Sequence, residues 1–80
     1  MYYVYVLQSS KDKSLYIGYT ADLKQRLVDH NEGKSKATRL KVPFKLIYYE
    51  AFLNKFDALN REKYLKSGYG RKTLQNALSE

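Results

Sequence analysis

The amino-terminal twenty residues constrain the fold most strongly, because they contain two short runs of strand-forming residues. Tyr2–Leu7 (YYVYVL) consists of aromatic, β-branched and leucine residues, a composition that favours a β-strand. Leu15–Tyr19 (LYIGY) predicts a second strand, and the polar segment Ser9–Ser14 lies between the two runs. Two strands separated by so short a turn predict an antiparallel β-hairpin.

A helix, a loop and a third strand are expected after the hairpin. The helix is predicted over 21–31, with Thr20 as its N-cap and Gly33 just beyond its end. Lys34–Val42 predicts a basic loop, and Phe44–Phe52 is rich enough in aromatic and branched residues to predict a strand.

The last third of the chain predicts two further helices. The first is expected over 55–66, capped by Asn54 and stopped by Gly68, and the second, shorter one over 71–78. The predicted order is therefore β-β-α-β-α plus a short C-terminal helix, all within a single domain, 1–80. This order is typical of an α+β fold, a small sheet with helices packed on it.

The composition excludes several kinds of site. The chain contains no cysteine, so a disulfide framework, a thiolate zinc site and a cysteine nucleophile are all excluded. No apolar run approaches the roughly 20 residues of a membrane span. Residues 1–10 lack the basic and apolar pattern of a secretory signal. We therefore expect a cytoplasmic protein with no membrane partner.

The charge distribution favours an anionic partner. The net charge is +7, from 15 Lys and Arg against 8 Asp and Glu. The span Gly33–Tyr49 contains no acid at all, whereas its cations are Lys34, Lys36, Arg39, Lys41 and Lys45. This pattern indicates a nucleic acid, although a basic surface can also serve solubility alone.

Three charged or titratable residues lie where helices should pack. Arg26 and His30, four residues apart, share one side of the first helix and flank its apolar stripe. Glu62 projects among the apolar residues of the later helix, where an unpaired carboxylate is costly. Ordinary explanations are a surface pair of Arg26 with Asp22, a helix-end role for His30, and an ion pair of Glu62 with Lys66 at the rim.

The hairpin supplies two tyrosines of interest. Tyr5 and Tyr16 could project to the same side of the sheet, because side chains alternate along each strand. The sequence does not fix the register, so two core aromatic residues remain the simple alternative.

Taken together, these residues resemble the GIY-YIG nuclease domain, and most closely its small stand-alone bacterial members. The resemblance rests on an ordered set: Val4-Tyr5-Val6, Tyr16-Ile17-Gly18, Arg26, His30 and Arg61-Glu62-Lys63. It spans nearly the whole chain, although Tyr3 and Val4 replace the Gly and Ile of the first motif. It implies a three-stranded antiparallel sheet flanked by helices.

The resemblance also implies roles for these residues. Glu62 would be the single carboxylate ligand of Mg²⁺ (or Mn²⁺), and Arg26 would hold the scissile phosphate. Tyr5 is the candidate general base, Tyr16 would orient water or phosphate, and His30 would support proton transfer or phosphate binding.

Two smaller features complete the implied site. Gly18 would let the backbone come close before the helix. Thr38 and Arg39 match a pair that the small members carry in the basic loop, and we expect them to contact nucleic acid.

Three functions remain open at this point. The first is a divalent-metal-dependent endonuclease that hydrolyses phosphodiester bonds, in DNA rather than RNA, with branched or damaged DNA in repair or recombination as the expected substrate. The second is a non-catalytic nucleic-acid-binding module of the same fold, which would need cations but no inward acid. The third is a protein-interaction module, supported only by the tyrosine-rich surface.

Overall fold

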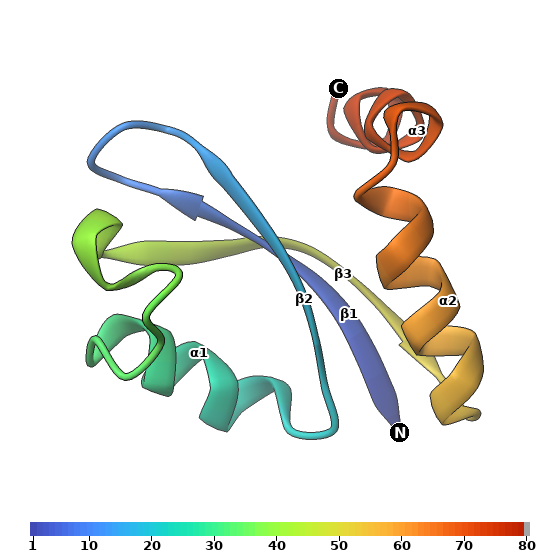
Figure 1. Cartoon of the computed structure of the whole chain (residues 1–80), viewed down its shortest axis with the longest axis horizontal. Helices are drawn as coiled ribbons and strands as arrows, with labels where there is room; N and C mark the ends of the chain where they lie inside the picture. The colour runs from blue at the N-terminus through green and yellow to red at the C-terminus, as the bar shows by residue number, and fades with distance from the viewer. Residues whose placement is uncertain (80) are drawn as a thin grey trace.

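The computed structural model describes residues 1–79 and confirms the α+β architecture (Figure 1). In chain order the elements are β1 (Tyr2–Ser9), β2 (Leu15–Thr20), α1 (Leu23–Asn31), a 3₁₀-helical turn (Arg39–Lys41), β3 (Phe44–Phe52), α2 (Lys55–Leu65) and α3 (Gly68–Leu78). No helix within this part of the chain combines the length and apolarity needed to cross a membrane.

The three strands form an antiparallel sheet in the order β2-β1-β3. The predicted hairpin is therefore confirmed, and its register pairs Tyr5 with Gly18 and Leu7 with Tyr16. The central position of β1 follows from its composition, because four consecutive residues, Val4 to Leu7, are buried on alternating faces. Both β2 and β3 are outer strands.

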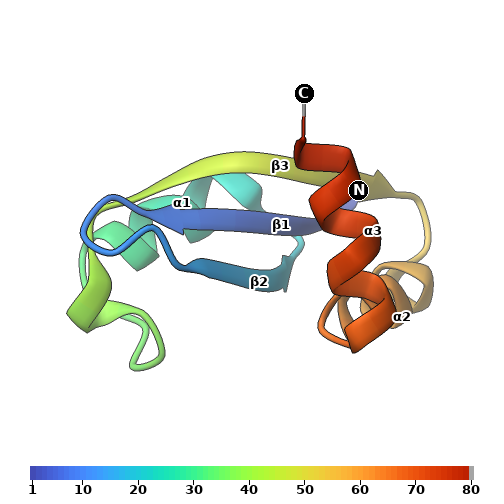
Figure 2. The same cartoon turned by 90° about the horizontal axis from the view of Figure 1, so that it is seen from above.

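Helices cover both faces of this sheet, α1 on one and the α2–α3 pair on the other (Figures 1 and 2). Under α1, Leu23 and Leu27 pack against Tyr5, Leu7 and Phe44. This arrangement splits the side chains of β1 between two separate clusters.

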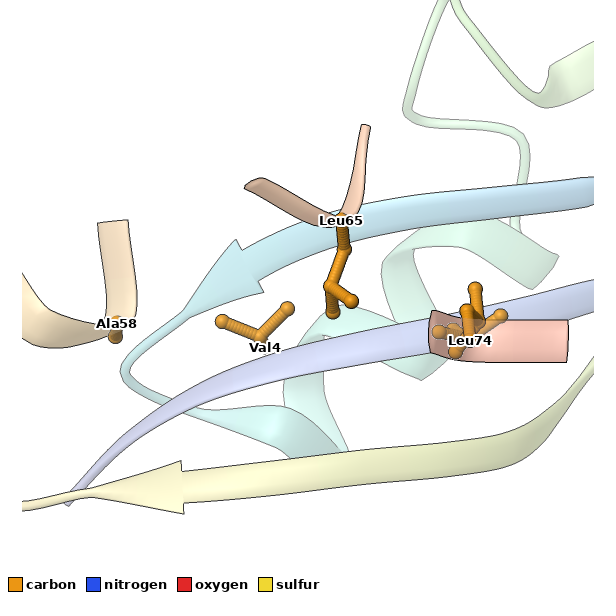
Figure 3. Close-up of a cluster of buried hydrophobic side chains, with 5 residues drawn as sticks. Val4, Ala58, Leu65 and Leu74 are labelled. Atoms are coloured by element: carbon orange, nitrogen blue, oxygen red, sulfur yellow. The ribbon is translucent and has the colours of Figure 1, made fainter. Parts of the chain in front are cut away.

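The larger cluster lies between the sheet and the α2–α3 pair. Val4 from β1 meets Ala58 and Leu65 from α2 and Leu74 from α3 (Figure 3). All four side chains are at least 97% buried, with exposures of 0% to 3%. This cluster fixes α2, the helix that carries Glu62, against the hairpin.

A bidentate ion pair adds a second attachment between α2 and β3. Arg61 donates from Nε to Glu50 Oε1 at 2.8 Å and from a terminal nitrogen to Glu50 Oε2 at 3.1 Å. Tyr48 donates its hydroxyl to the same carboxylate at 2.6 Å. Burial opposes ionisation of Glu50, but these hydrogen bonds outweigh it and lower the pKa of the carboxyl.

Two predicted helix boundaries were wrong. Thr20, expected as the N-cap of α1, instead ends β2, and Asp22 is the N-cap, accepting from the Gln25 amide. Gly68, expected as the stop of α2, is the first residue of α3, because Ser67 caps that helix through the Gly70 amide. In both places several polar residues that suit caps and turns are adjacent, so a local pattern does not choose between them.

The corner between α2 and α3 generates the first prediction. A Cβ added at Gly70 would overlap the Tyr64 carbonyl, whereas one added at Gly68 would meet nothing within 4 Å. We expect Gly70→Ala to lower the free energy of unfolding by about 1–3 kcal/mol, because backbone has to move. Gly68→Ala is the matched control and should be neutral or stabilising by up to about 1 kcal/mol. Urea unfolding of both variants measures this, and equal effects would contradict the packing described.

Candidate active site

The hydroxyl of Tyr5 is the centre of a polar cluster beneath α1. Its oxygen lies 2.9 Å from Nε2 of His30, and it accepts a hydrogen bond from Nε of Arg26 at 3.4 Å. Because the two partners are four residues apart on α1, one helix face presents both to the same phenol. The sequence-predicted residues Tyr5, Arg26 and His30 therefore meet in one place.

Gly18 makes this meeting possible. It lies opposite Tyr5 in the register, and a Cβ built at Gly18 would overlap the Oη and Cζ atoms of Tyr5. The phenol thus lies across the backbone of β2, towards the outer edge of the sheet. The group that comes close to the backbone at Gly18 is the Tyr5 ring.

Tyr16 stands beside this cluster on the same face of the sheet, as the strand alternation predicts. Its ring centroid lies 6.4 Å from that of Tyr5 and 5.1 Å from that of His30. Tyr16 is only half-buried, whereas Tyr5 is 1% exposed and His30 is fully buried. Tyr16 therefore gives the cluster its accessible phenol.

Thr38 holds the other side of the histidine ring. Its Oγ1 lies 2.7 Å from Nδ1 of His30, and Thr38 is only 1% exposed. The prediction that Thr38 contacts nucleic acid is contradicted, because a buried hydroxyl bonded to His30 presents nothing to a ligand. Thr38 instead positions the imidazole, a role that no local sequence signal could have indicated.

Burial and the Arg26 cation set the protonation of the cluster. Burial raises the pKa of the Tyr5 phenol above its usual value, and the Arg26 hydrogen bond opposes this. Burial also lowers the pKa of His30, and the Arg26 charge lowers it further. The imidazole is therefore neutral near pH 7 and can donate at one nitrogen while accepting at the other.

Glu62 reaches the site from the opposite helical layer. Its half-buried side chain, 21% exposed, makes an ion pair with Lys66 at 3.0 Å. The ordinary explanation that the sequence offered for Glu62, an ion pair with Lys66 at the rim, is therefore present in the structure. Burial is the main cause of the raised pKa of Tyr5, and the charge of Glu62 adds to it, so the carboxylate lies within electrostatic range of the phenol.

The donor set fits only one kind of metal site. Within residues 1–79, no group of three or more His, Cys, Asp or Glu side chains could hold an ion. A single carboxylate at the rim suits a hydrated Mg²⁺ that completes its coordination with water and substrate phosphate. It does not suit a cation held by protein ligands alone.

The basic loop contacts the site through Thr38, and two of its predicted cations form ion pairs with acids. Lys34 pairs with Glu32 at 3.1 Å and with Asp29 at 3.7 Å. Lys41 pairs with Asp12 at 3.5 Å and donates to Ser14 Oγ at 3.4 Å. The remaining predicted cations are exposed: Lys36, Arg39 and Lys45.

Comparisons with known proteins agree with the resemblance inferred from the sequence. Residues 1–75 match the family model described as the GIY-YIG catalytic domain. A UPF0213 protein of Streptococcus pyogenes strain Manfredo is 47% identical over 78 residues, which cover 96% of this chain and 80% of that protein. The solution NMR structure of a UPF0213 protein from Bacillus halodurans superposes with a TM-score of 0.57 and 38% identity. That match covers 96% of this chain and 85% of the other.

The close fit of Tyr5 over Gly18 can be tested by substitution. Gly18→Ala should lower the free energy of unfolding by about 1–3 kcal/mol, because the Tyr5 ring has to leave its position. In a Tyr5→Leu background the same substitution should cost less, since no phenol then lies across β2. A double-mutant cycle by urea unfolding measures the coupling, and additive effects would contradict the packing.

A second prediction uses the fact that His30 is the only histidine in the chain. Because burial depresses its pKa below the ordinary 6.5, the unfolded chain binds a proton at higher pH than the folded chain does. This contribution to the free energy of unfolding is fully present above about pH 6.5 and is lost as the pH falls through the folded-state pKa.

The measurement is thermal unfolding of the wild type and of His30→Gln from about pH 8 to pH 5, above the ordinary carboxylate range. The wild type should lose stability towards pH 5, and the variant should show a flatter profile from a lower starting value. Parallel profiles would show that His30 does not titrate as its burial implies.

Proposed function

The chain belongs to the GIY-YIG family, a family of nuclease domains, and we propose that it is a divalent-metal-dependent endonuclease that hydrolyses phosphodiester bonds in DNA. One observation carries the proposal: the Tyr5 hydroxyl contacts both His30 and Arg26, with Tyr16 beside them. A structural core has no need for a phenol, an imidazole and a guanidinium at one point.

Arg26 would bind the scissile phosphate. Its guanidinium is half-buried at the edge of the cluster and is held by Tyr5. A guanidinium presents a rigid set of donors to phosphate oxygens and offsets the charge that develops during attack. Arg26 also covers the Tyr5 hydroxyl, so its movement to a phosphate would open access to that phenol.

Tyr5 and His30 would remove the proton from the attacking water. Because its pKa is raised, the Tyr5 phenol keeps its proton near pH 7 and needs a partner in order to act as a base. Neutral His30 can accept the Tyr5 proton at Nε2 while Nδ1–H donates to Thr38. As the water oxygen bonds to phosphorus, its proton passes to Tyr5 Oη and the phenolic proton passes to His30. The bond from phosphorus to the leaving oxygen breaks, and solvent protonates that oxygen. Tyr16 would orient the water or the phosphate.

Glu62 would hold the divalent cation. When bound, Mg²⁺ or Mn²⁺ would supply electrostatic stabilisation of the charge on the phosphate oxygens. In the free protein, Lys66 forms an ion pair with the Glu62 carboxylate, so the metal ion has to compete with Lys66. We therefore expect weak metal binding without substrate.

The net charge of +7 and the exposed cations of the basic loop support an anionic polymer as substrate. The likeness to small stand-alone members extends the proposal to branched or damaged DNA, in repair or recombination, acted on in the cytoplasm. The second candidate is a non-catalytic nucleic-acid-binding module. The ion pair that holds Glu62 favours it, because Lys66 could serve there as a permanent partner.

Cleavage kinetics distinguish the two candidates. Glu62→Gln should lower the single-turnover cleavage rate by about a thousandfold or more, because metal stabilisation is worth several kcal/mol. Its affinity for DNA should persist. Arg26→Ala should lower both rate and affinity, since the guanidinium also contacts the ground-state phosphate. The assay uses linear, branched and single-stranded DNA and RNA with Mg²⁺, Mn²⁺ or EDTA.

The matched control is Asp57→Asn, which removes an exposed acid from the same helix as Glu62. It should retain the wild-type rate. Wild-type cleavage that survives unchanged in Glu62→Gln would remove this residue from the mechanism. If the wild type cuts no substrate with either metal, the binding module becomes the better assignment.

A further inference from the structure

An open groove runs along the outer edge of β2, on the side of the α2–α3 pair. We call it the β2-edge groove; it has a volume of about 520 Å³. Its walls include Ser14 and Tyr16 from the hairpin, Lys66 just after α2, and Arg71 and Leu74 from α3. Tyr16 thus borders both this groove and the Tyr5–His30 cluster.

The β2-edge groove is positively charged. Among its described lining residues are two cations, Lys66 and Arg71, and no acid. Lys41, which is not a lining residue, reaches the hairpin end, where it donates to Ser14 Oγ at 3.4 Å and pairs with Asp12 at 3.5 Å. A groove lined by two cations and no acid suits a phosphate-bearing strand rather than an apolar ligand.

We propose that the β2-edge groove binds the sugar–phosphate backbone of the substrate strand next to the scissile phosphate, with Arg71 and Lys66 contacting the neighbouring phosphate. The inference rests on the proposed function for its substrate class. Continuity with Tyr16 places the groove beside the reacting phosphate, and the fork of Arg71 matches phosphate oxygens. Sequence reasoning assigned nucleic-acid binding to the 34–45 segment and assigned no such role to these two residues.

The ion pair of Lys66 with Glu62 links the groove to metal binding. In the free protein its ammonium is held by Glu62 at 3.0 Å, yet its side chain remains 51% exposed. A phosphate in the groove offers Lys66 another anion and releases the carboxylate of Glu62. Occupation of the groove therefore favours metal binding, and by linkage the metal favours occupation of the groove.

The test compares Arg71→Ala with Lys72→Ala, which removes the adjacent exposed cation on the same helix, outside the groove lining. Fluorescence anisotropy in EDTA measures binding of labelled single-stranded and branched DNA over a series of salt concentrations. Arg71→Ala should weaken affinity by about fivefold or more and reduce the log–log salt slope by roughly 0.7–0.9, the contribution of one phosphate contact. Lys72→Ala should leave both close to wild type. Arg71→Lys should restore most of the slope, and circular dichroism verifies that each variant is folded.

The linkage is tested by Mn²⁺ titration of the wild type and of Lys66→Met in the absence of DNA. The variant should bind Mn²⁺ more tightly, because Glu62 is then free. Unchanged Mn²⁺ affinity would overturn the linkage.

The outcomes separate this proposal from the proposed function. Equal losses of DNA affinity in Arg71→Ala and Lys72→Ala would overturn the groove, because the effect would then come from the overall positive charge and not from a specific contact. Wild-type protein that cuts DNA with no contribution from Arg71 would also overturn it while leaving the nuclease assignment in place. An Arg71-specific loss of binding in a protein that cuts nothing would support the groove and overturn the nuclease. Absence of binding by the wild type at low salt would overturn both.

Discussion

The candidate site depends on the phenol of Tyr5 lying across the backbone of Gly18. Because β2 carries no side chain at that point, the phenol has room beneath α1, and its hydroxyl meets Arg26 and His30 there. His30 also contacts Thr38, so the middle of the basic loop is anchored by the same chain of hydrogen bonds.

The site is assembled from both helical layers around an outer strand. Tyr5, Tyr16, Arg26 and His30 lie on the α1 side of the sheet, whereas Glu62 and Lys66 belong to the opposite layer. Their relative placement is set by the cluster around Leu65 and by the bidentate pair of Arg61 with Glu50. These contacts give a small domain a means of holding two halves of a site in register without a deep pocket.

Much of the fold could be predicted from local patterns. The strand Phe44–Phe52 and the cap Asn54 agree with the sequence prediction, because strand composition and capping chemistry are properties of neighbouring residues. The surroundings of Thr38 and of Lys66 depend instead on contacts between separate parts of the chain. Thr38 is buried by a contact with a ring eight residues away. The ion pair of Lys66 with Glu62 depends on how closely α2 packs against the sheet, and a helical projection does not give that distance.

In the candidate site, too, some features follow from local sequence patterns and others only from tertiary packing. The face shared by Arg26 and His30 follows from helical spacing, and the common side of Tyr5 and Tyr16 follows from strand alternation once the register is known. The size of the space over Gly18 and the groove between Tyr16 and Arg71 arise only when separate elements pack together. Spacing therefore identified candidate residues, and tertiary packing determined which atoms they meet.

The outer position of β2 also limits how this chain can assemble. An outer strand offers unpaired backbone donors and acceptors to a second sheet. A partner strand added to β2 would cover Tyr16 and occupy the mouth of the β2-edge groove, so such an assembly and access to the site exclude one another. The opposite edge, β3, has no such conflict, and a dimer that extends the sheet through β3 would leave two grooves open on its far sides.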